Sequence, residues 1–220
     1  MAEFEYIAPG SRSGLLRLAT VAEIANELLD GGLAVLPTET GYMLAALATS
    51  EEAILRAFAV KQRDLKHTMH VACSSLDMVR DVADTDARVR RLIGQLTPGP
   101  ITVVTRQTSR LPDRLVTVNG TVGIRVPDNP ATLQVISAVG APLTATSLNR
   151  AGEPPTSIDR QELELLGWPS GRTVYVVEDE GSIGYDRPST VVRVAGSDLE
   201  ILREGPVSEE VVRDVWKACA

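Results

Sequence analysis

The chain alternates between apolar positions at helical spacing and short continuous apolar runs, a pattern that predicts helices and buried strands in alternation. The first helical pattern follows Thr20, with Glu23 three residues later as in a capping box, and Gly31 ends it. Its apolar positions are Val21, Ile24, Ala25 and Leu28. Ser50 is placed to cap a second helix to about Ala59, for which we expect a buried face of Ile54, Leu55 and Phe58.

The stretch from Gly31 to Leu47 places a polar turn between two apolar runs. Leu33 to Leu36 are apolar, Pro37 interrupts the run, and the polar residues 38–41 precede a second apolar run at 42–47. A short apolar run bounded by turn residues is typical of a buried strand, and proline donates no ladder hydrogen bond. Because open α/β sheets bind ligands at strand ends, this turn is a candidate site, and an ordinary capped turn is the alternative.

The remaining pattern predicts a mixed sheet covered by helices. We expect strands near 15–18 and at 69–73, 101–105, 121–126, 142–146, 173–177, 189–194 and 199–202. We expect further helices at 75–82, 84–96, 129–139, 159–166 and 208–218. Without a clear linker or internal repeat, this order predicts one α/β domain over residues 1–220.

Composition narrows the class of protein. The 220 residues are 44% hydrophobic and 23% charged, which suits a globular core. The net charge of −7 argues against a protein that mainly coats nucleic acid, because that affinity comes from Lys and Arg. The two cysteines are far apart and form neither a disulfide framework nor a zinc spacing. No signal peptide and no membrane-spanning run is visible, so we expect a soluble cytoplasmic protein without a membrane partner.

Cations gather where the predicted elements end. Lys61 and Arg63 follow a helix, and Arg125 and Arg203 end strands. Arginine binds carboxylate or phosphate in a bidentate manner and lysine acts as a point charge, so these four residues are a candidate anion site. The alternative is that each is a solvated loop residue, and we expect Arg88, Arg90 and Arg91 to form such a solvated helix face. A P-loop is excluded because no Gly-Lys-Ser/Thr occurs, and no GxSxG supports a serine triad.

Seven segments in order carry a family resemblance: PTETGY, KQR, TPGPITVV, VGIRVPDNP, TSLNRAGEPPT, STVV and ILREG. The chain resembles the YrdC-like family, the threonylcarbamoyl-AMP synthases, over about residues 20–207. The resemblance implies a twisted mixed sheet flanked by helices around a large, concave, positively charged cavity. It also implies an enzyme that condenses L-threonine with bicarbonate and adenylates the product with ATP. Threonylcarbamoyl-AMP and pyrophosphate result, for the t6A modification of tRNA at position 37.

The same resemblance assigns residues to these substrates. The catalytic cations are Lys61, Arg63 and Arg125. The threonine-binding residues are Thr38, Arg125, Ala145 and Ser189. The ATP-binding residues are Lys61, Arg63, His67, Thr121, Ser147, Asn149 and Arg203. No residue is assigned to a metal, since Mg²⁺ is expected to be held mainly by phosphate oxygens.

Some positions depart from the family pattern and keep other functions open. Met43 and Leu44 replace Gly-Leu, Asp64 replaces a proline, and Leu148 stands where the family has a small residue. The features that favour the YciO branch are Gly41-Tyr42, His67, the TPG and RVP-x-NP segments and the Thr-Ser-Leu sequence that ends at Leu148. The alternatives are therefore a YciO-like paralogue that binds nucleotide, tRNA or double-stranded RNA with little synthase activity, and carbamoyl transfer to another acceptor. The partners implied are the small-molecule substrates and the downstream t6A transferase machinery.

Overall fold

The computed structural model describes residues 1–10, 13–62, 64–65, 67–108, 111–113, 115–148 and 159–219. The strands are β1 (Glu3–Ile7), β2 (Ala34–Thr38), β3 (Gly41–Ala45), β4 (His70–Ala72), β5 (Ile101–Arg106), β6 (Thr117–Val118), β7 (Thr121–Arg125), β8 (Leu143–Ser147), β9 (Thr173–Val177), β10 (Thr190–Ala195) and β11 (Asp198–Arg203). The helices are α1 (Leu18–Leu29), α2 (Glu51–Val60), α3 (Leu76–Val82), α4 (Ala87–Leu96), α5 (Pro130–Val139), α6 (Arg160–Glu164) and α7 (Glu209–Ala218), with a short 3₁₀ helix η1 (Glu180–Ser182) between β9 and β10.

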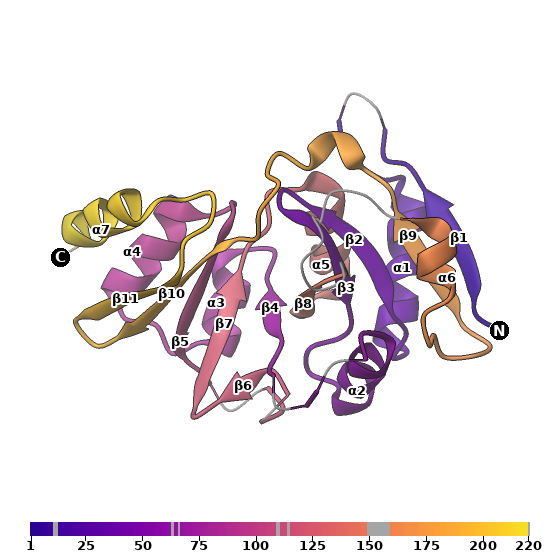
Figure 1. Ribbon diagram of the computed structural model, residues 1–220, viewed down its shortest axis with the longest axis horizontal. Helices are drawn as coiled ribbons and strands as arrows, with labels where there is room; N and C mark the ends of the chain where they lie inside the picture. The colour runs from indigo at the N-terminus through magenta and orange to yellow at the C-terminus, as the bar shows by residue number, and fades with distance from the viewer. Residues whose placement is uncertain are drawn as a thin grey trace.

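All eleven strands form one mixed sheet, in the order β1-β9-β2-β3-β8-β4-β7-β5-β10-β11, and β6 pairs with β7 beside this path. Parallel pairs join β1 to β9, β2 to β9, β4 to β7 and β5 to β10, and the other ladders are antiparallel. The two termini lie at opposite ends of the molecule (Figure 1). The expected α/β fold with a mixed sheet is therefore confirmed.

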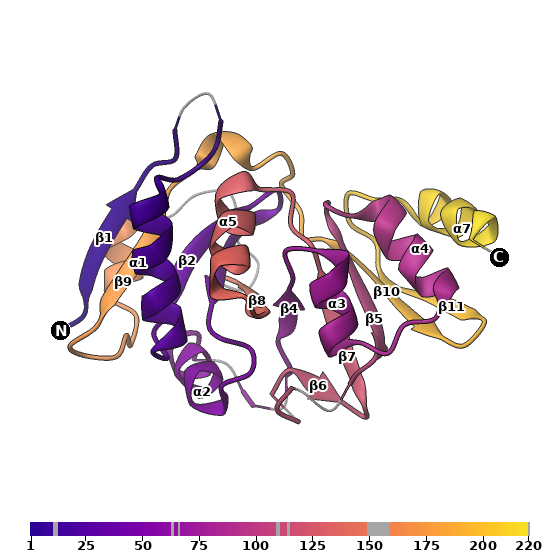
Figure 2. The ribbon, with the colours of Figure 1, turned by 180° about the vertical axis from the view of Figure 1, so that it is seen from behind.

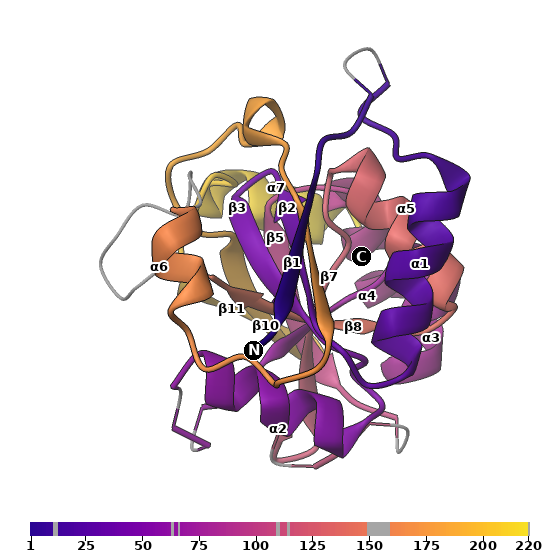
Figure 3. The same ribbon diagram turned by 90° about the vertical axis from the view of Figure 1, so that its right-hand side faces the viewer.

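Strands β2 and β3 are buried on both faces, because their alternate residues enter different hydrophobic clusters. Leu36 and Met43 pack in the cluster that contains the inner faces of α1 and α5. Val35 and Leu44 pack in the larger cluster, which includes residues of α2, α3, α4 and α7. Figure 2 shows α1 and α5 side by side against the sheet, and Figure 3 shows α2 and α6 on the opposite side of these strands. Buried neighbours on both faces hold the β2–β3 hairpin firmly in place.

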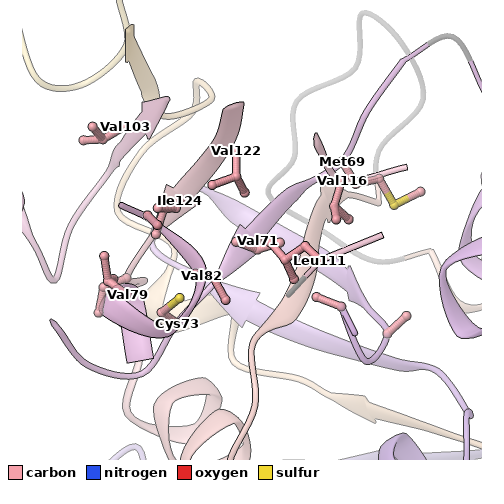
Figure 4. Close-up of a cluster of buried hydrophobic side chains, with 14 of the residues drawn as sticks. Met69, Val71, Cys73, Val79, Val82, Val103, Leu111, Val116, Val122 and Ile124 are labelled. Atoms are coloured by element: carbon pink, nitrogen blue, oxygen red, sulfur yellow. The ribbon is translucent and has the colours of Figure 1, made fainter. Parts of the chain in front are cut away.

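The larger cluster continues under α3, where β4, β5 and β7 contribute β-branched side chains (Figure 4). Val71 and Cys73 meet Val79 and Val82 of α3 there. All four are at most 1% exposed, so the larger cluster extends without interruption from the β2–β3 hairpin into this half of the sheet. Burial raises the pKa of the Cys73 thiol to about 12.

Several local expectations are confirmed and others are wrong. Val21, Ile24, Ala25 and Leu28 are the buried face of α1, as predicted. The predicted capping box is wrong: α1 begins at Leu18, so Thr20 lies inside it, and Arg17 makes no side-chain cap. The strand expected near 15–18 is likewise wrong, and β1 lies earlier in the chain.

Two further corrections concern side chains near element ends. Leu55 of α2 is 41% exposed, whereas Ile54 and Phe58 are buried as predicted. Arg88 is not a solvated residue, because its guanidinium stacks 3.7 Å from the centre of the Trp216 ring on α7.

No helix in the described part of the chain is long and apolar enough to span a bilayer.

Candidate functional site

The polar turn at 38–41 closes the β2–β3 hairpin. Thr38 pairs with Gly41, and the Thr38 hydroxyl donates to the Gly41 carbonyl oxygen over 2.7 Å. Thr38, Glu39 and Thr40 are all buried, at 1%, 5% and 6% exposed. Pro37 lies within β2 and does not end the strand. The proline is tolerated there because β9 pairs only with Ala34 and Val35, so no hydrogen bond from position 37 to β9 is needed. The turn thus buries three polar side chains at one end of a hairpin.

Glu39 of this turn forms a buried ion pair with Arg125, the last residue of β7. Arg125 Nη2 donates to Glu39 Oε1 over 2.7 Å and to Thr40 Oγ1 over 3.2 Å. Glu39 Oε2 accepts the backbone N–H of Asp128 over 2.8 Å. Strands β8 and β4 separate β3 from β7 in the sheet, so the curvature of the sheet brings the hairpin turn back to the end of β7.

A second arginine lies close to this pair. Arg203, at the end of β11, donates from Nε and Nη2 to the Ser189 carbonyl oxygen over 3.0 and 2.8 Å. The Ser189 hydroxyl is 3.0 Å from the Thr102 hydroxyl of β5. Burial and the positive charge of Arg125 together lower the pKa of Arg203. The Arg125 cluster, defined as Thr38, Glu39, Thr40, Arg125, Ser189 and Arg203, therefore contains two cations and one carboxylate.

The connection between β9 and β10 contacts the Arg125 cluster through hydrogen bonds to Glu39. It passes the turn of the β2–β3 hairpin before entering β10 (Figure 1). The backbone N–H groups of Gly184 and Tyr185 both donate to the Glu39 carbonyl oxygen over 3.1 Å. Asn129, which caps α5, donates to the Ser182 hydroxyl over 2.8 Å. The first two bonds hold the main chain of Glu39, and the third joins η1 to the start of α5.

The other predicted residues occupy different places in the fold. Lys61 is the half-buried C-cap residue that follows α2, and His67 is exposed. Thr121 begins β7, where its hydroxyl donates to the Val118 carbonyl oxygen. Ala145 lies opposite His70 in the β8–β4 ladder, and Ser147 is exposed at the end of β8.

Of the predicted site, the structure therefore brings together Thr38, Arg125, Ser189 and Arg203. Arg63 and Asn149 lie outside the described residues. The large concave cavity stays a prediction, since these two are among the residues expected to line it. The described residues contain no group of three or more His, Cys, Asp or Glu that could hold a metal ion.

Glu39 and Thr40 are members of the cluster that the sequence argument did not assign. A signal for Glu39 was present, because it is the sole charged residue between Leu33 and Ala48. A carboxylate within a buried stretch requires a positive partner or several hydrogen bonds. The identity of that partner, 86 residues away, could not be read from the local pattern.

A family model and several relatives of known name match this chain over most of its length. The family model Sua5_yciO_yrdC, described as "Telomere recombination", matches residues 26–205. A protein of Xanthomonas oryzae pv. oryzae named threonylcarbamoyl-AMP synthase is 32% identical over 195 residues, which cover 86% of this chain and all of that protein. The uncharacterized protein YciO of Escherichia coli K12 is 29% identical over 206 residues, 93% of this chain and 96% of its own.

Solved structures agree with the sequence matches. The crystal structure of E. coli YciO superposes with a TM-score of 0.78 at 26% identity and covers 96% of this chain and 100% of that one. The crystal structure of P. abyssi Sua5 complexed with L-threonine gives a TM-score of 0.82 at 23% identity, a likeness of fold. The match covers 96% of this chain and 60% of the P. abyssi protein.

Proposed function

Because the chain belongs to the Sua5–YciO–YrdC family, we propose that it is an ATP-dependent threonylcarbamoyl-AMP synthase. The amine of L-threonine attacks bicarbonate and loses water to give N-carboxythreonine. The new carbamate oxygen attacks the α-phosphorus of ATP and expels pyrophosphate. The product serves the t6A modification of tRNA at position 37. The observation that carries the proposal is the Arg125 cluster, in which a buried guanidinium lies beside a second arginine and several hydroxyls.

The Arg125 cluster suits the amino-acid substrate. Arg125 is 9% exposed, and a guanidinium removed from water binds a carboxylate strongly. Thr38 and Ser189 offer hydroxyls within the same cluster, and Ala145 leaves room as a small residue. Fixing the carboxylate orients the amine for attack on bicarbonate, which is the main contribution that such a binding site makes to a two-substrate reaction.

ATP requires a different set of side chains. We assign its phosphates to Lys61 and Arg63, and the remaining ATP contacts to His67, Thr121, Ser147, Asn149 and Arg203. Cations near the α-phosphate stabilise the charge that develops as pyrophosphate leaves. Mg²⁺, when bound, neutralises the phosphate oxygens that hold it, so the protein need supply no carboxylate cage. The name of the X. oryzae relative and the L-threonine in the P. abyssi Sua5 crystal support this assignment.

Pyrophosphate release tests the proposal. We expect release only when ATP, bicarbonate and L-threonine are all present. Lys61→Ala should lower the rate at least tenfold through lost phosphate contacts. Lys217→Ala is the matched control, because Lys217 is an exposed lysine of α7 that pairs with Asp214. Pyrophosphate that does not depend on threonine, or none at all, contradicts the proposed activity.

A second candidate rests on Leu148, which follows β8. Its backbone N–H donates to the Tyr42 carbonyl oxygen over 2.9 Å, and its half-buried side chain packs against the larger cluster. A bulky residue there favours a YciO-like paralogue that binds nucleotide or RNA with little synthesis. Steeply salt-dependent binding of tRNA or double-stranded RNA without turnover supports that function. Turnover with carbamoyl phosphate in place of bicarbonate would instead indicate carbamoyl transfer.

A further inference from the structure

We infer that Glu39 makes the Arg125 cluster selective for one monoanionic group, such as an amino-acid carboxylate, over a dianion such as phosphate. The identity of the amino acid rests on the proposed function. The selection by charge does not, because it follows from side chains that are described here. Glu39 would act as a positioning and specificity-determining residue that does not itself touch the reacting atoms.

The first step of the argument is that Glu39 fixes Arg125 in one orientation. The Glu39 and Arg125 side chains are 6% and 10% exposed, and each Glu39 oxygen already accepts one hydrogen bond. Arg125 Nη2 is committed to Glu39 and Thr40 together. Because the Glu39 backbone is also bonded to Gly184 and Tyr185, neither partner of the ion pair can turn without breaking several contacts.

The second step concerns the donor that remains. Arg125 Nε is buried and has no hydrogen-bond acceptor among the described residues. A buried N–H without an acceptor is costly, and a ligand oxygen that accepts its hydrogen bond removes this cost. A positively charged group binds an anion more strongly in such surroundings than in water. Arg125 Nε is therefore the donor that we assign to the incoming carboxylate.

The third step is the balance of charge. Arg125 and Arg203 contribute two positive charges, and Glu39 is the carboxylate in contact with Arg125. Of the nearby acids, Asp179 is bonded to Asn129 and forms no ion pair with either arginine in the described part of the chain, and the Asp128 side chain is exposed to solvent. The cluster thus keeps one net positive charge. A monoanion neutralises it, whereas a dianion leaves an excess negative charge beside Glu39, which buried sites disfavour.

The variant Glu39→Gln tests this inference, since it keeps the side-chain shape and removes the charge. The readout is the NMR signal of Arg125 Nε–H, assigned by its loss in Arg125→Lys, during titrations with L-threonine and with inorganic phosphate at about pH 8. In the native protein we expect phosphate to bind at least about tenfold more weakly than threonine. In Glu39→Gln we expect phosphate to bind about tenfold more tightly than in the native protein.

Thr40→Val is the matched control, because it removes the other Nη2 contact without a change of charge. Its preference between threonine and phosphate should equal that of the native protein. A folded Glu39→Gln protein with unchanged phosphate affinity overturns the inference. If the native protein fails to bind threonine, the proposed substrate is wrong, and the phosphate titrations still decide the role of Glu39.

A second measurement covers the case in which Glu39→Gln does not fold. The native protein alone is then titrated with acetate and with phosphate, and the Arg125 Nε–H signal is followed as before. Tighter binding of acetate, a monoanion, supports the inference. Binding of phosphate at this signal that equals or exceeds that of acetate overturns it.

Discussion

Single residues at this site are held by partners from distant segments. Glu39 depends on Arg125 and on the backbone of Asp128, 86 and 89 residues later in the chain. Arg125 and Arg203 were predicted as site residues because cations at element ends suit anions, and Thr38 and Ser189 were assigned through the family resemblance. Their mutual contacts could not be predicted, because no local pattern records which strand ends meet in space.

Cys73 provides a prediction at the same scale, because its buried thiol has a pKa of about 12 against 9.0 for an ordinary cysteine. The folded state keeps the proton more tightly than the unfolded chain. Its stabilising effect is therefore complete below about pH 9 and is lost as the pH rises toward 12. We expect the free energy of unfolding to fall by about 2 kcal/mol between pH 8 and pH 10.5 from this group.

Urea denaturation at both pH values measures the effect. Cys73→Ala is the reference, since it retains every other group that titrates in this range. The variant should be less stable at pH 8, and its stability should depend less on pH. Equal pH dependence of the two proteins would show that the Cys73 thiol does not control alkaline stability.

At the scale of elements, local sequence predicted caps and faces well. Ser50 caps α2 through its side chain, as its position before an apolar-periodic segment indicates, whereas Asn129, which was expected to begin the helix at 129–139, is the cap of α5. The same reasoning failed for Thr20, because α1 begins two residues earlier, at Leu18, and Arg17 before it makes no side-chain cap. Strand β6, of two residues, was too short to leave any periodic pattern.

Gly205 offers a prediction about the segment between β11 and α7. A Cβ atom there would lie 2.3 Å from the Pro188 carbonyl oxygen and 2.5 Å from the Thr190 backbone nitrogen. Gly205→Ala must therefore displace backbone next to Ser189, the residue that orients Arg203. We expect roughly 1–3 kcal/mol lower stability and weaker anion binding. Gly167→Ala, with no atom within 4 Å of the added Cβ, should change neither in urea denaturation and ligand titration.

Helices α4 and α7 give a second prediction at this scale. Arg88 Nε and Nη2 donate to the Trp216 carbonyl oxygen over 3.3 and 3.0 Å while the guanidinium stacks on its ring. Arg88→Ala should cost about 1–2 kcal/mol in the free energy of unfolding. Arg80→Ala is the control, and its exposed pair with Asp77 should contribute no more than about 0.5 kcal/mol. Equal losses in the two variants would contradict a special role for Arg88.

The whole molecule forms the candidate site from the β2–β3 turn and from the ends of β7 and β11, so only the folded chain can bind the substrate there. L-Threonine at one hundred times its dissociation constant should raise the free energy of unfolding by about 2.7 kcal/mol. Urea denaturation with and without the ligand measures this shift. L-Threonine amide, which lacks the carboxylate, should give little stabilisation. Stabilisation equal to that by L-threonine would show that Arg125 does not bind the carboxylate of the ligand.

Local sequence patterns were enough to predict the α/β class and most helix and strand positions. These properties depend on neighbours within a few positions, through capping, periodicity and turn chemistry. Only the tertiary structure decided that β1 joins β9, that the β2–β3 turn meets the end of β7, and that Glu39 neutralises Arg125. Strand order and sheet curvature bring together segments more than eighty residues apart, and that choice follows from the packing of two hydrophobic clusters as a whole.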